Sequence, residues 1–250
     1  MVLAPREVIS VDLPVEFDTA WAHVRCPQLI HRWYGWGGTT ADDGIRQRFL
    51  LDASVHLPDP GLPLGWLHWH NHDHLEVRGG WSNTPRSTVT VRRQERALLA
   101  SYDGVRDAVD EAWITFLHQL RFAVSHHLGK ERVSFTMRGS GAEPPDRTLY
   151  RAGLHGARGV PLGGAVEVRR PDGSVAGGTL EFSEAHQFGI RLSGRGGSLL
   201  VVQLLPPASR PPHGAVNVMW SVWGQDADEI ESARRRWSSW WRAPVAARRA

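Results

Sequence analysis

The stretch from Tyr102 to Phe122 constrains the fold more than any other part of the chain. It begins with a polar segment, 102–107, and continues into an amphipathic helix expected at about 105–128, which Gly129 would end. Apolar residues recur along this helix at helical spacing: Val105, Val109, Trp113, Phe116, Leu120 and Val124. A long helix with one apolar stripe must bury that stripe against another layer of structure.

A strand-rich region precedes the helix and supplies that layer. Residue alternation predicts strands at 8–13, 46–55, 65–70, 74–78 and 87–93, with short helices at 17–24 and 27–34. This order predicts an α+β fold, in which a curved antiparallel sheet wraps around the long helix. Folds of this kind often hold an apolar cavity between sheet and helix.

The second half of the chain repeats the same order in a shorter form. Strands are expected at 132–138, 165–169, 178–182, 188–193, 198–204 and 216–223, with a short helix at 146–154 and a closing helix at 226–241. The repeated order predicts two tandem α+β domains, residues 1–130 and residues 131–250. One domain with a sheet-rich extension is the alternative.

Three segments of the first half resemble a known family: Ala20-Trp21, residues 27–33 ending in Gly35, and above all 102–107 followed by the aromatic helix. Together they resemble the SRPBCC superfamily, and within it bacterial proteins related to the Aha-type activators of the heat-shock chaperone ATPase. The resemblance covers about residues 6–128. It implies a helix-grip fold with an internal cavity. The superfamily has no shared catalytic motif, so the resemblance assigns no catalytic residue.

Composition narrows the partners and the compartment. The net charge is +3 over 250 residues, a weak signal for nucleic-acid binding, and Lys130 is the only lysine, which is typical of a GC-rich bacterial genome. No apolar run approaches the roughly 20 residues that span a bilayer. Cys26 is the only cysteine, so no intramolecular disulfide forms. A cytoplasmic protein without nucleic-acid or membrane partners is expected.

Aromatic residues are concentrated in the first half and suggest a binding site. Nine residues are predicted to line a ligand cavity: Trp33, Tyr34, Trp36, Trp66, Trp69, Trp81, Trp113, Phe116 and Leu120. An aromatic wall suits an apolar or aromatic ligand. For any single tryptophan, ordinary core packing is the alternative.

The segment 68–74 is the densest polar cluster, with four histidines at every second position. On one strand they would form a row, in which His68, His70, His72 and the nearby Glu76 are candidates for acid–base catalysis. His68 and His70 are weak candidates for metal ligands, which Glu76 or His118 would complete. A turn through residues 71–73 is the alternative and would break the row. No cofactor is predicted.

These features lead to three hypotheses of function. The first is a cytoplasmic protein that binds a small hydrophobic or aromatic molecule. The second is an enzyme of the cyclase, aromatase or hydrolase type that uses the histidines for acid–base chemistry. The third is a regulator of a chaperone ATPase with a protein partner. The basic, tryptophan-rich segment 234–242 favours a closing core helix over a binding surface, since its apolar residues share one helical face.

Overall fold

The structure of this chain is a computed structural model. It describes residues 5–36, 42–57, 61–80, 85–94, 105–139, 142–169, 175–194, 197–226, 228–232 and 234–235. The chain divides into two compact units, Met1–Arg132 (unit 1) and Val133–Ala250 (unit 2). It is mixed α+β, with two antiparallel sheets and few helices.

Unit 1 contains five strands and four α-helices among its described residues. In chain order the elements are β1 (Arg6–Leu13), α1 (Phe17–Arg25), α2 (Pro27–Ile30), α3 (Asp42–Arg46), a π-helix (Gln47–Leu51), β2 (Ala53–His56), β3 (Leu64–Trp69), β4 (His74–Gly79), β5 (Ser87–Arg93) and α4 (Ala108–His126). The strand order is β1-β5-β4-β3-β2, so the first strand pairs with the last and the others follow in sequence.

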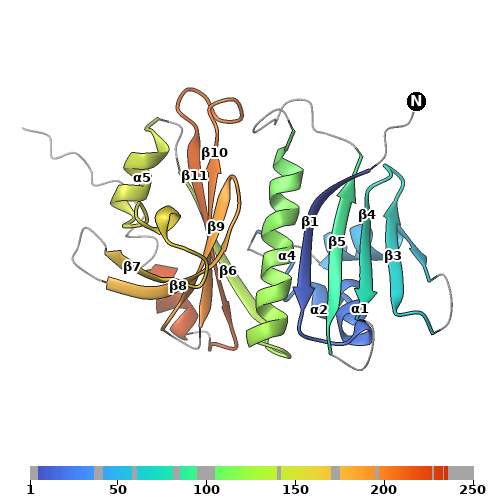
Figure 1. Ribbon diagram of the computed structural model, residues 1–250. Helices are drawn as coiled ribbons and strands as arrows, with labels where there is room; N and C mark the ends of the chain where they lie inside the picture. Colours follow the sequence, from blue (N-terminus) through green and yellow to red (C-terminus); the bar gives the residue numbers. More distant parts are fainter. Residues whose placement is uncertain are drawn as a thin grey trace, which may run out of the picture. The chain divides into compact units, whose positions relative to one another are not determined.

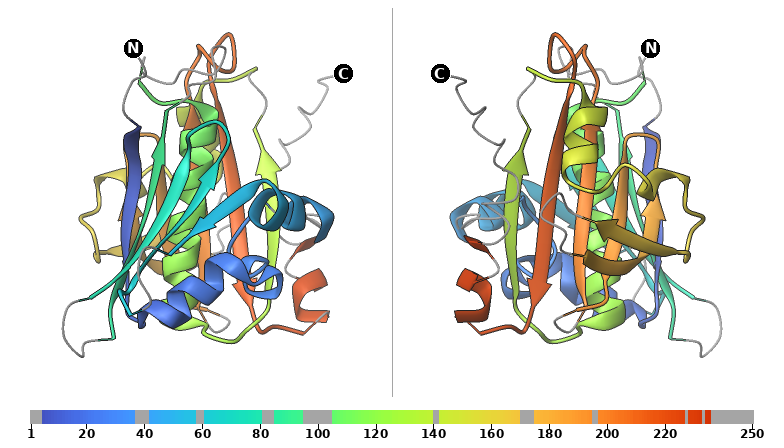
Figure 2. Two further views of the ribbon diagram at one scale, coloured as in Figure 1. Left: turned by 90° about the vertical axis from the view of Figure 1, so that its right-hand side faces the viewer. Right: turned by 90° about the vertical axis from the view of Figure 1, so that its left-hand side faces the viewer.

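The sheet of unit 1 has two faces of different chemistry. Side chains alternate across a strand, and β3 accordingly buries Gly65, Leu67 and Trp69 while the residues between them are only half-buried. The buried face meets α4, which runs along β1 and the neighbouring strands (Figure 1). Helix α1 packs on β4 and β5, and Figure 2 shows it crossing the end of the sheet.

Helix α4 confirms the predicted long helix and starts three residues later than expected. Asp107 is its N-cap and accepts hydrogen bonds from the amides of Val109 and Asp110, while Asp110 accepts one from the Asp107 amide. This reciprocal capping box fixes the first turn. Val105 therefore lies before the helix and is 52% exposed, so it does not belong to the buried stripe.

The predicted strand 46–55 is wrong over most of its length. Residues 42–46 form α3, and the π-helix follows, marked by a hydrogen bond from the Asp52 amide to the Gln47 carbonyl of 2.8 Å. Ile45 and Phe49 are both buried, and their spacing of four residues is helical. Only β2 at the end of this segment is extended.

Unit 2 follows the predicted strand positions closely. Its elements are β6 (Arg132–Arg138), α5 (Pro145–Arg151), a 3-10 turn (Ala157–Gly159), β7 (Ala165–Arg169), β8 (Val175–Ser183), β9 (Gln187–Leu192), β10 (Ser198–Leu205) and β11 (Ala215–Trp223). The strand order is β6-β11-β10-β9-β8-β7, so here too the first strand pairs with the last. The core is mostly aliphatic and is centred on β9, β10 and β11.

After β11, residues 228–232 and 234–235 are helical, which agrees with the start of the expected closing helix. Trp237, Trp240 and Trp241 lie outside the described residues. Among the helices of the described chain, none combines the length and hydropathy needed to cross a bilayer.

Candidate functional site

Six aromatic side chains fill the layer between the sheet of unit 1 and α4. They are Trp33, Tyr34, Phe49, Trp69, Trp113 and Phe116, and we call this set the aromatic layer. Tyr34 is its centre, with its ring centroid 4.6 Å from that of Phe116, 4.9 Å from Phe49 and 5.9 Å from Trp113. Most ring pairs meet edge to face or tilted, which is the favoured geometry for aromatic pairs.

A guanidinium group lies against two rings of this layer. Arg48, on the π-helix, places its guanidinium carbon 5.6 Å from the ring centroid of Trp69 and 5.4 Å from that of Trp113. The Arg48 carbonyl accepts a hydrogen bond of 2.8 Å from Trp69 Nε1. The Nε of Arg48 is buried and has no hydrogen-bond partner among the described residues. The two indole faces hold the cation, but they do not satisfy its N–H donors.

The hydroxyl group of Tyr34 adds a second polar atom to the layer. Burial raises the pKa of Tyr34, and the positive charge of Arg48 offsets part of that increase. The phenol is therefore neutral at physiological pH and remains able to donate a proton or a hydrogen bond. A phenol and a guanidinium thus lie among aromatic rings, a combination typical of a binding site with few polar groups.

Arg132 fixes the segment that carries Tyr34. Its guanidinium donates hydrogen bonds to the carbonyl oxygens of Trp33 (3.2 Å), Tyr34 and Gly35 (3.3 Å), and to the side-chain oxygen of Gln119. All four acceptors are neutral. Desolvation lowers the pKa of Arg132 to about 9, so the group still carries its charge at pH 7.

The structure places the nine predicted ligand-lining residues in different environments. Leu120 is fully buried in the same core, and the ring centroid of half-buried Trp36 lies 5.7 Å from that of Phe116. Five others belong to the aromatic layer: Trp33, Tyr34, Trp69, Trp113 and Phe116. The prediction is wrong for Trp66, which points to the opposite face of β3 because residues of adjacent number alternate across a strand. Trp81 lies outside the described residues.

Trp33 is buried and makes a hydrogen bond in addition to its ring contacts. Its side chain is fully buried, and its Nε1 donates a hydrogen bond of 2.9 Å to the His23 carbonyl. A buried indole with a satisfied N–H is typical of a core residue. Tyr34 and Trp36 are the half-buried aromatic residues of the segment and are the ones a ligand would reach first.

The predicted catalytic residues divide between the outer face of the sheet and a turn. His68 lies opposite His74 across β3 and β4, with ring centroids 5.3 Å apart, and Trp66 lies opposite Glu76. The His56 ring is 5.3 Å from Trp66. This outer-face cluster is separated from the aromatic layer by the sheet itself, because the layer uses the alternate residues of the same strands.

The continuous histidine row is wrong. Strand β3 ends at Trp69, and a turn follows in which the His72 amide donates to the Trp69 carbonyl (2.9 Å) and the Asp73 amide donates to Asn71 Oδ1 (3.2 Å). His72 has a positive φ of 63°, and both His70 and His72 are exposed. The Asn-His-Asp sequence therefore forms the alternative turn, which removes His70 and His72 from the face that carries His68.

Glu76 is held as a carboxylate by its neighbours. Trp66 Nε1 donates to it at 2.9 Å and Arg78 at 3.0 Å, while Arg92 Nη1 lies 3.5 Å away. Desolvation acts to raise the pKa of Glu76, but the hydrogen bonds from Trp66 and Arg78 and the charges of both arginines outweigh it, and the pKa falls below its usual value. A carboxylate with a lowered pKa and occupied oxygens is a weak general base.

Two histidines of the outer face, His68 and His74, have lowered basicity. Desolvation, followed by the charge of His56, lowers the pKa of His68. Desolvation, His68 and Arg92 lower the pKa of His74, and a backbone hydrogen bond and Glu76 oppose this shift only in part. His118 lies on α4 and is buried. Within the described residues, no group of three or more His, Cys, Asp or Glu side chains is arranged to hold a metal ion.

A buried ion network, which sequence reasoning missed, lies at the start of α4. Arg93 at the end of β5 donates to Asp73 (2.9 Å), Asp107 (2.8 Å) and Asp110 (2.6 Å), and Arg6 also binds Asp110. All but Arg6 are buried. Burial opposes the charge of Arg93, but its hydrogen bond to Asp73 and the surrounding carboxylates raise its pKa. The network ties the turn after β3, the last strand and the start of α4 together, and the spacing of the two capping aspartates was its only sequence signal.

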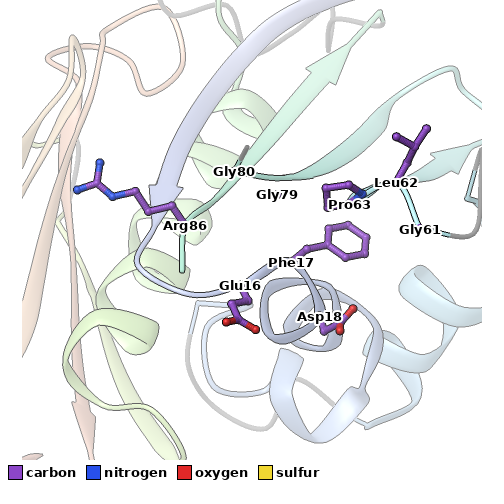
Figure 3. Close-up of a pocket in the computed structure, with 9 residues that line it drawn as sticks. All are labelled: Glu16, Phe17, Asp18, Gly61, Leu62, Pro63, Gly79, Gly80 and Arg86. Carbon is purple, nitrogen blue, oxygen red and sulfur yellow. The ribbon is translucent and has the colours of Figure 1, made fainter. Parts of the chain in front are cut away.

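A cavity of about 470 Å³ lies elsewhere in unit 1, where α1 begins (Figure 3). Its lining residues are Glu16, Phe17, Asp18, Gly61, Leu62, Pro63, Gly79, Gly80 and Arg86. Figure 3 shows the Phe17 ring beside Pro63, with the carboxylates of Glu16 and Asp18 at the start of the helix. Of the eight predicted ligand residues that the structure describes, none lines this cavity or the hollow of about 410 Å³ on α5.

Comparisons with known proteins do not assign the chain to a family. No family model matches it, and no curated protein matches it. Among solved structures it is similar to the di-domain ARO/CYC BexL from the BE-7585A biosynthetic pathway, at 14% identity and a TM-score of 0.35, covering 95% of this chain and 94% of that one. It is also similar to the di-domain ARO/CYC StfQ from the steffimycin biosynthetic pathway, at 12% identity and a TM-score of 0.34, covering 93% of each chain. At these identities and TM-scores, function must be inferred from the residues of this chain.

Proposed function

We propose that unit 1 binds a small aromatic molecule at the aromatic layer. The observation that carries this proposal is that the Arg48 guanidinium lies against two rings of the layer, Trp69 and Trp113, while the Tyr34 phenol lies at its centre. An ordinary core would avoid a cation whose Nε is buried without a hydrogen-bond partner among the described residues. A flat ligand that stacks on the rings and accepts hydrogen bonds from these two groups would satisfy both.

Entry of the ligand requires a rearrangement, because the rings already fill the layer. Tyr34 and Trp36 are half-buried and follow the short helix α2, so they are the side chains that would be displaced. Arg132 holds the backbone of this segment through its carbonyl oxygens, so only the side chains would have to move. The ligand would then replace ring contacts with contacts of its own.

We assign both units to the helix-grip type of the SRPBCC superfamily, as tandem copies with boundaries near residues 130 and 131. In support, each sheet pairs its first strand with its last and runs through the other strands in sequence. Each unit also has short helical elements after its first strand and a helix after its last strand. A relation to Aha-type activators, and with it a protein partner, is the weaker part of this assignment, since nothing in the described part of the site supports it.

The test is titration calorimetry with 2-naphthalenecarboxamide, a neutral aromatic probe. The wild-type chain is expected to bind it, and Phe116→Ala is expected to weaken binding about tenfold or more, because Phe116 contacts Tyr34 in the layer. Phe188→Ala is the matched control, since Phe188 is equally buried in unit 2. Equal binding by both variants, or no binding by the wild-type chain, contradicts the proposal.

A second candidate function is chemistry of the aromatase or cyclase type on the bound molecule. The observation that favours it is the pairing of the neutral Tyr34 phenol with the Arg48 guanidinium. The phenol can donate a proton, and the guanidinium can stabilise the negative charge of an enolate oxygen. Tyr34 and Arg48 then take the place of His68 and Glu76, which lie on the other face of the sheet. Incubation with a poly-β-ketone and mass analysis should show loss of water with the wild-type chain and not with Tyr34→Phe. Turnover by Tyr34→Phe at the wild-type rate contradicts this candidate.

A further inference from the structure

Two arginines at or beside the aromatic layer have no carboxylate partner among the described residues. Arg132 binds three backbone carbonyl oxygens and one amide oxygen. Arg48 lies over the faces of Trp69 and Trp113. In contrast, Arg93 in the same unit is surrounded by three aspartates. Arg48 and Arg132 therefore both carry a positive charge that no carboxylate of the described residues neutralises.

Arg48 is the one of the two that a ligand can reach. It is half-buried, and its Nε has no hydrogen-bond partner within the described part of the chain, whereas the guanidinium of Arg132 is occupied by its four acceptors. A guanidinium offers five N–H donors in a fixed plane and binds two oxygens of an acid side by side. The two tryptophans limit its rotation by stacking on it. The Arg48 guanidinium is thus fixed in place and has N–H donors available to a ligand.

The π-helix accounts for this position of Arg48. Its wider turn is formed by residues 47–51, and the Arg48 carbonyl is bound by Trp69 Nε1 at 2.8 Å. Single π-turns are rare in proteins and occur often at functional sites. The backbone here is arranged so that Phe49 is fully buried while the preceding side chain lies against the indole rings.

We infer that the molecule bound at the aromatic layer is an aromatic acid, whose carboxylate, phenolate or enolate oxygen binds the guanidinium of Arg48. This inference rests on the proposed function and adds the charge of the ligand to it. The neutral Tyr34 phenol supplies a further hydrogen-bond donor in the same layer. Arg132 adds a positive charge that no carboxylate of the described residues neutralises.

The experiment compares two probes of nearly the same shape by titration calorimetry: 2-naphthoate and 2-naphthalenecarboxamide. The wild-type chain is expected to bind the acid about tenfold or more tightly than the amide, as charge-assisted hydrogen bonds are roughly twice as strong as neutral ones. Arg48→Met should remove this preference, because loss of the guanidinium charge lowers the affinity for the acid more than the affinity for the amide. Arg48→Lys should keep part of the preference, and exposed Arg46→Met is the matched control that should keep all of it.

The outcomes separate this inference from the proposed function. Equal binding of the two probes by the wild-type chain, or an acid preference that survives in Arg48→Met, overturns the inference and leaves aromatic binding intact. Failure of the wild-type chain to bind the amide overturns the proposed function, and failure to bind the acid as well overturns the inference with it. A preference lost in Arg48→Met but kept in Arg46→Met supports both.

Discussion

The two units share a strand order but differ in what they bury. Unit 1 encloses a network of arginines and aspartates and an aromatic layer that includes Arg48. Unit 2 has a mostly aliphatic core, and each ion pair described within it has partly exposed side chains. Burying charge is costly unless each group is matched. This difference in buried charge is why we place the proposed binding site in unit 1.

The ion network offers the strongest test of this difference. Arg93→Met would leave three aspartates near one another without their shared cation, and we expect it to lower the free energy of unfolding by about 3–5 kcal/mol. Arg191→Met in unit 2 is the control, because Arg191 is 41% exposed and lies 3.9 Å from Glu181. Such an exposed pair contributes little. Urea unfolding measures the free energy of unfolding of both variants. A similar loss in each would show that the buried network contributes no more to stability than the exposed pair.

The next largest effect distinguishes a loss of core packing, expected in both units, from a loss of ligand binding, expected in unit 1 alone. Trp113→Ala and Trp220→Ala each remove a buried indole, one from each unit, and each is expected to cost about 3–5 kcal/mol of stability. Only Trp113 belongs to the aromatic layer, so only Trp113→Ala should abolish binding of 2-naphthalenecarboxamide. Near-ultraviolet circular dichroism confirms that the variants are folded before calorimetry. Loss of binding in Trp220→Ala alone would move the functional site to unit 2.

The contrast between the units also explains what the sequence could predict. The strands of unit 2 and helix α4 follow local periodicity, because alternation and helical spacing record which side of each element is buried. The position of Arg48 depends on Trp69 and Trp113, which are far away in sequence, and no local pattern encodes such contacts. The same is true of Arg132, whose partners include residues 33–35. Five of the six aromatic residues of the layer were among those predicted from the sequence. Phe49, which lies in the wrongly predicted strand 46–55, was missed, and so were Arg48 and Arg132.

The histidine cluster shows the limit of a period-two pattern. His68, His70, His72 and His74 would share a face only if the strand continued, and the turn-forming residues Asn71 and Asp73 were the signal that it does not. Because β3 ends at Trp69, only His68 and His74 come together, across two strands. The chemistry expected from the row is lost with it.

A smaller effect is expected where backbone elements approach closely in unit 1. A Cβ atom at Gly79 would lie 2.5 Å from the Cβ of Pro63 and 3.1 Å from that of Phe17. Gly79→Ala should therefore destabilise the chain by about 1–3 kcal/mol. Gly177 in β8 of unit 2 is the control, since no described atom lies within 4 Å of its Cβ position, and Gly177→Ala should change stability by about 0.5 kcal/mol or less. Thermal unfolding compares the two, and a harmless Gly79→Ala would mean that Pro63 can move aside.

The smallest effect concerns the pH dependence that the outer face gives to unit 1. Because the pKa values of His68 and His74 in the folded chain lie below the ordinary value of 6.5, the unfolded chain takes up protons first as the pH falls. The stability that these two neutral histidines contribute is complete above pH 6.5 and is lost as the pH drops through their lowered pKa values. The double variant His68→Gln, His74→Gln should therefore lose less stability than the wild-type chain between about pH 7.5 and about pH 5.5. His213→Gln, at an exposed position of unit 2, is the matched control. Urea midpoints at the two pH values measure the difference, and an unchanged pH dependence in the double variant would show that the acid sensitivity of the chain arises elsewhere.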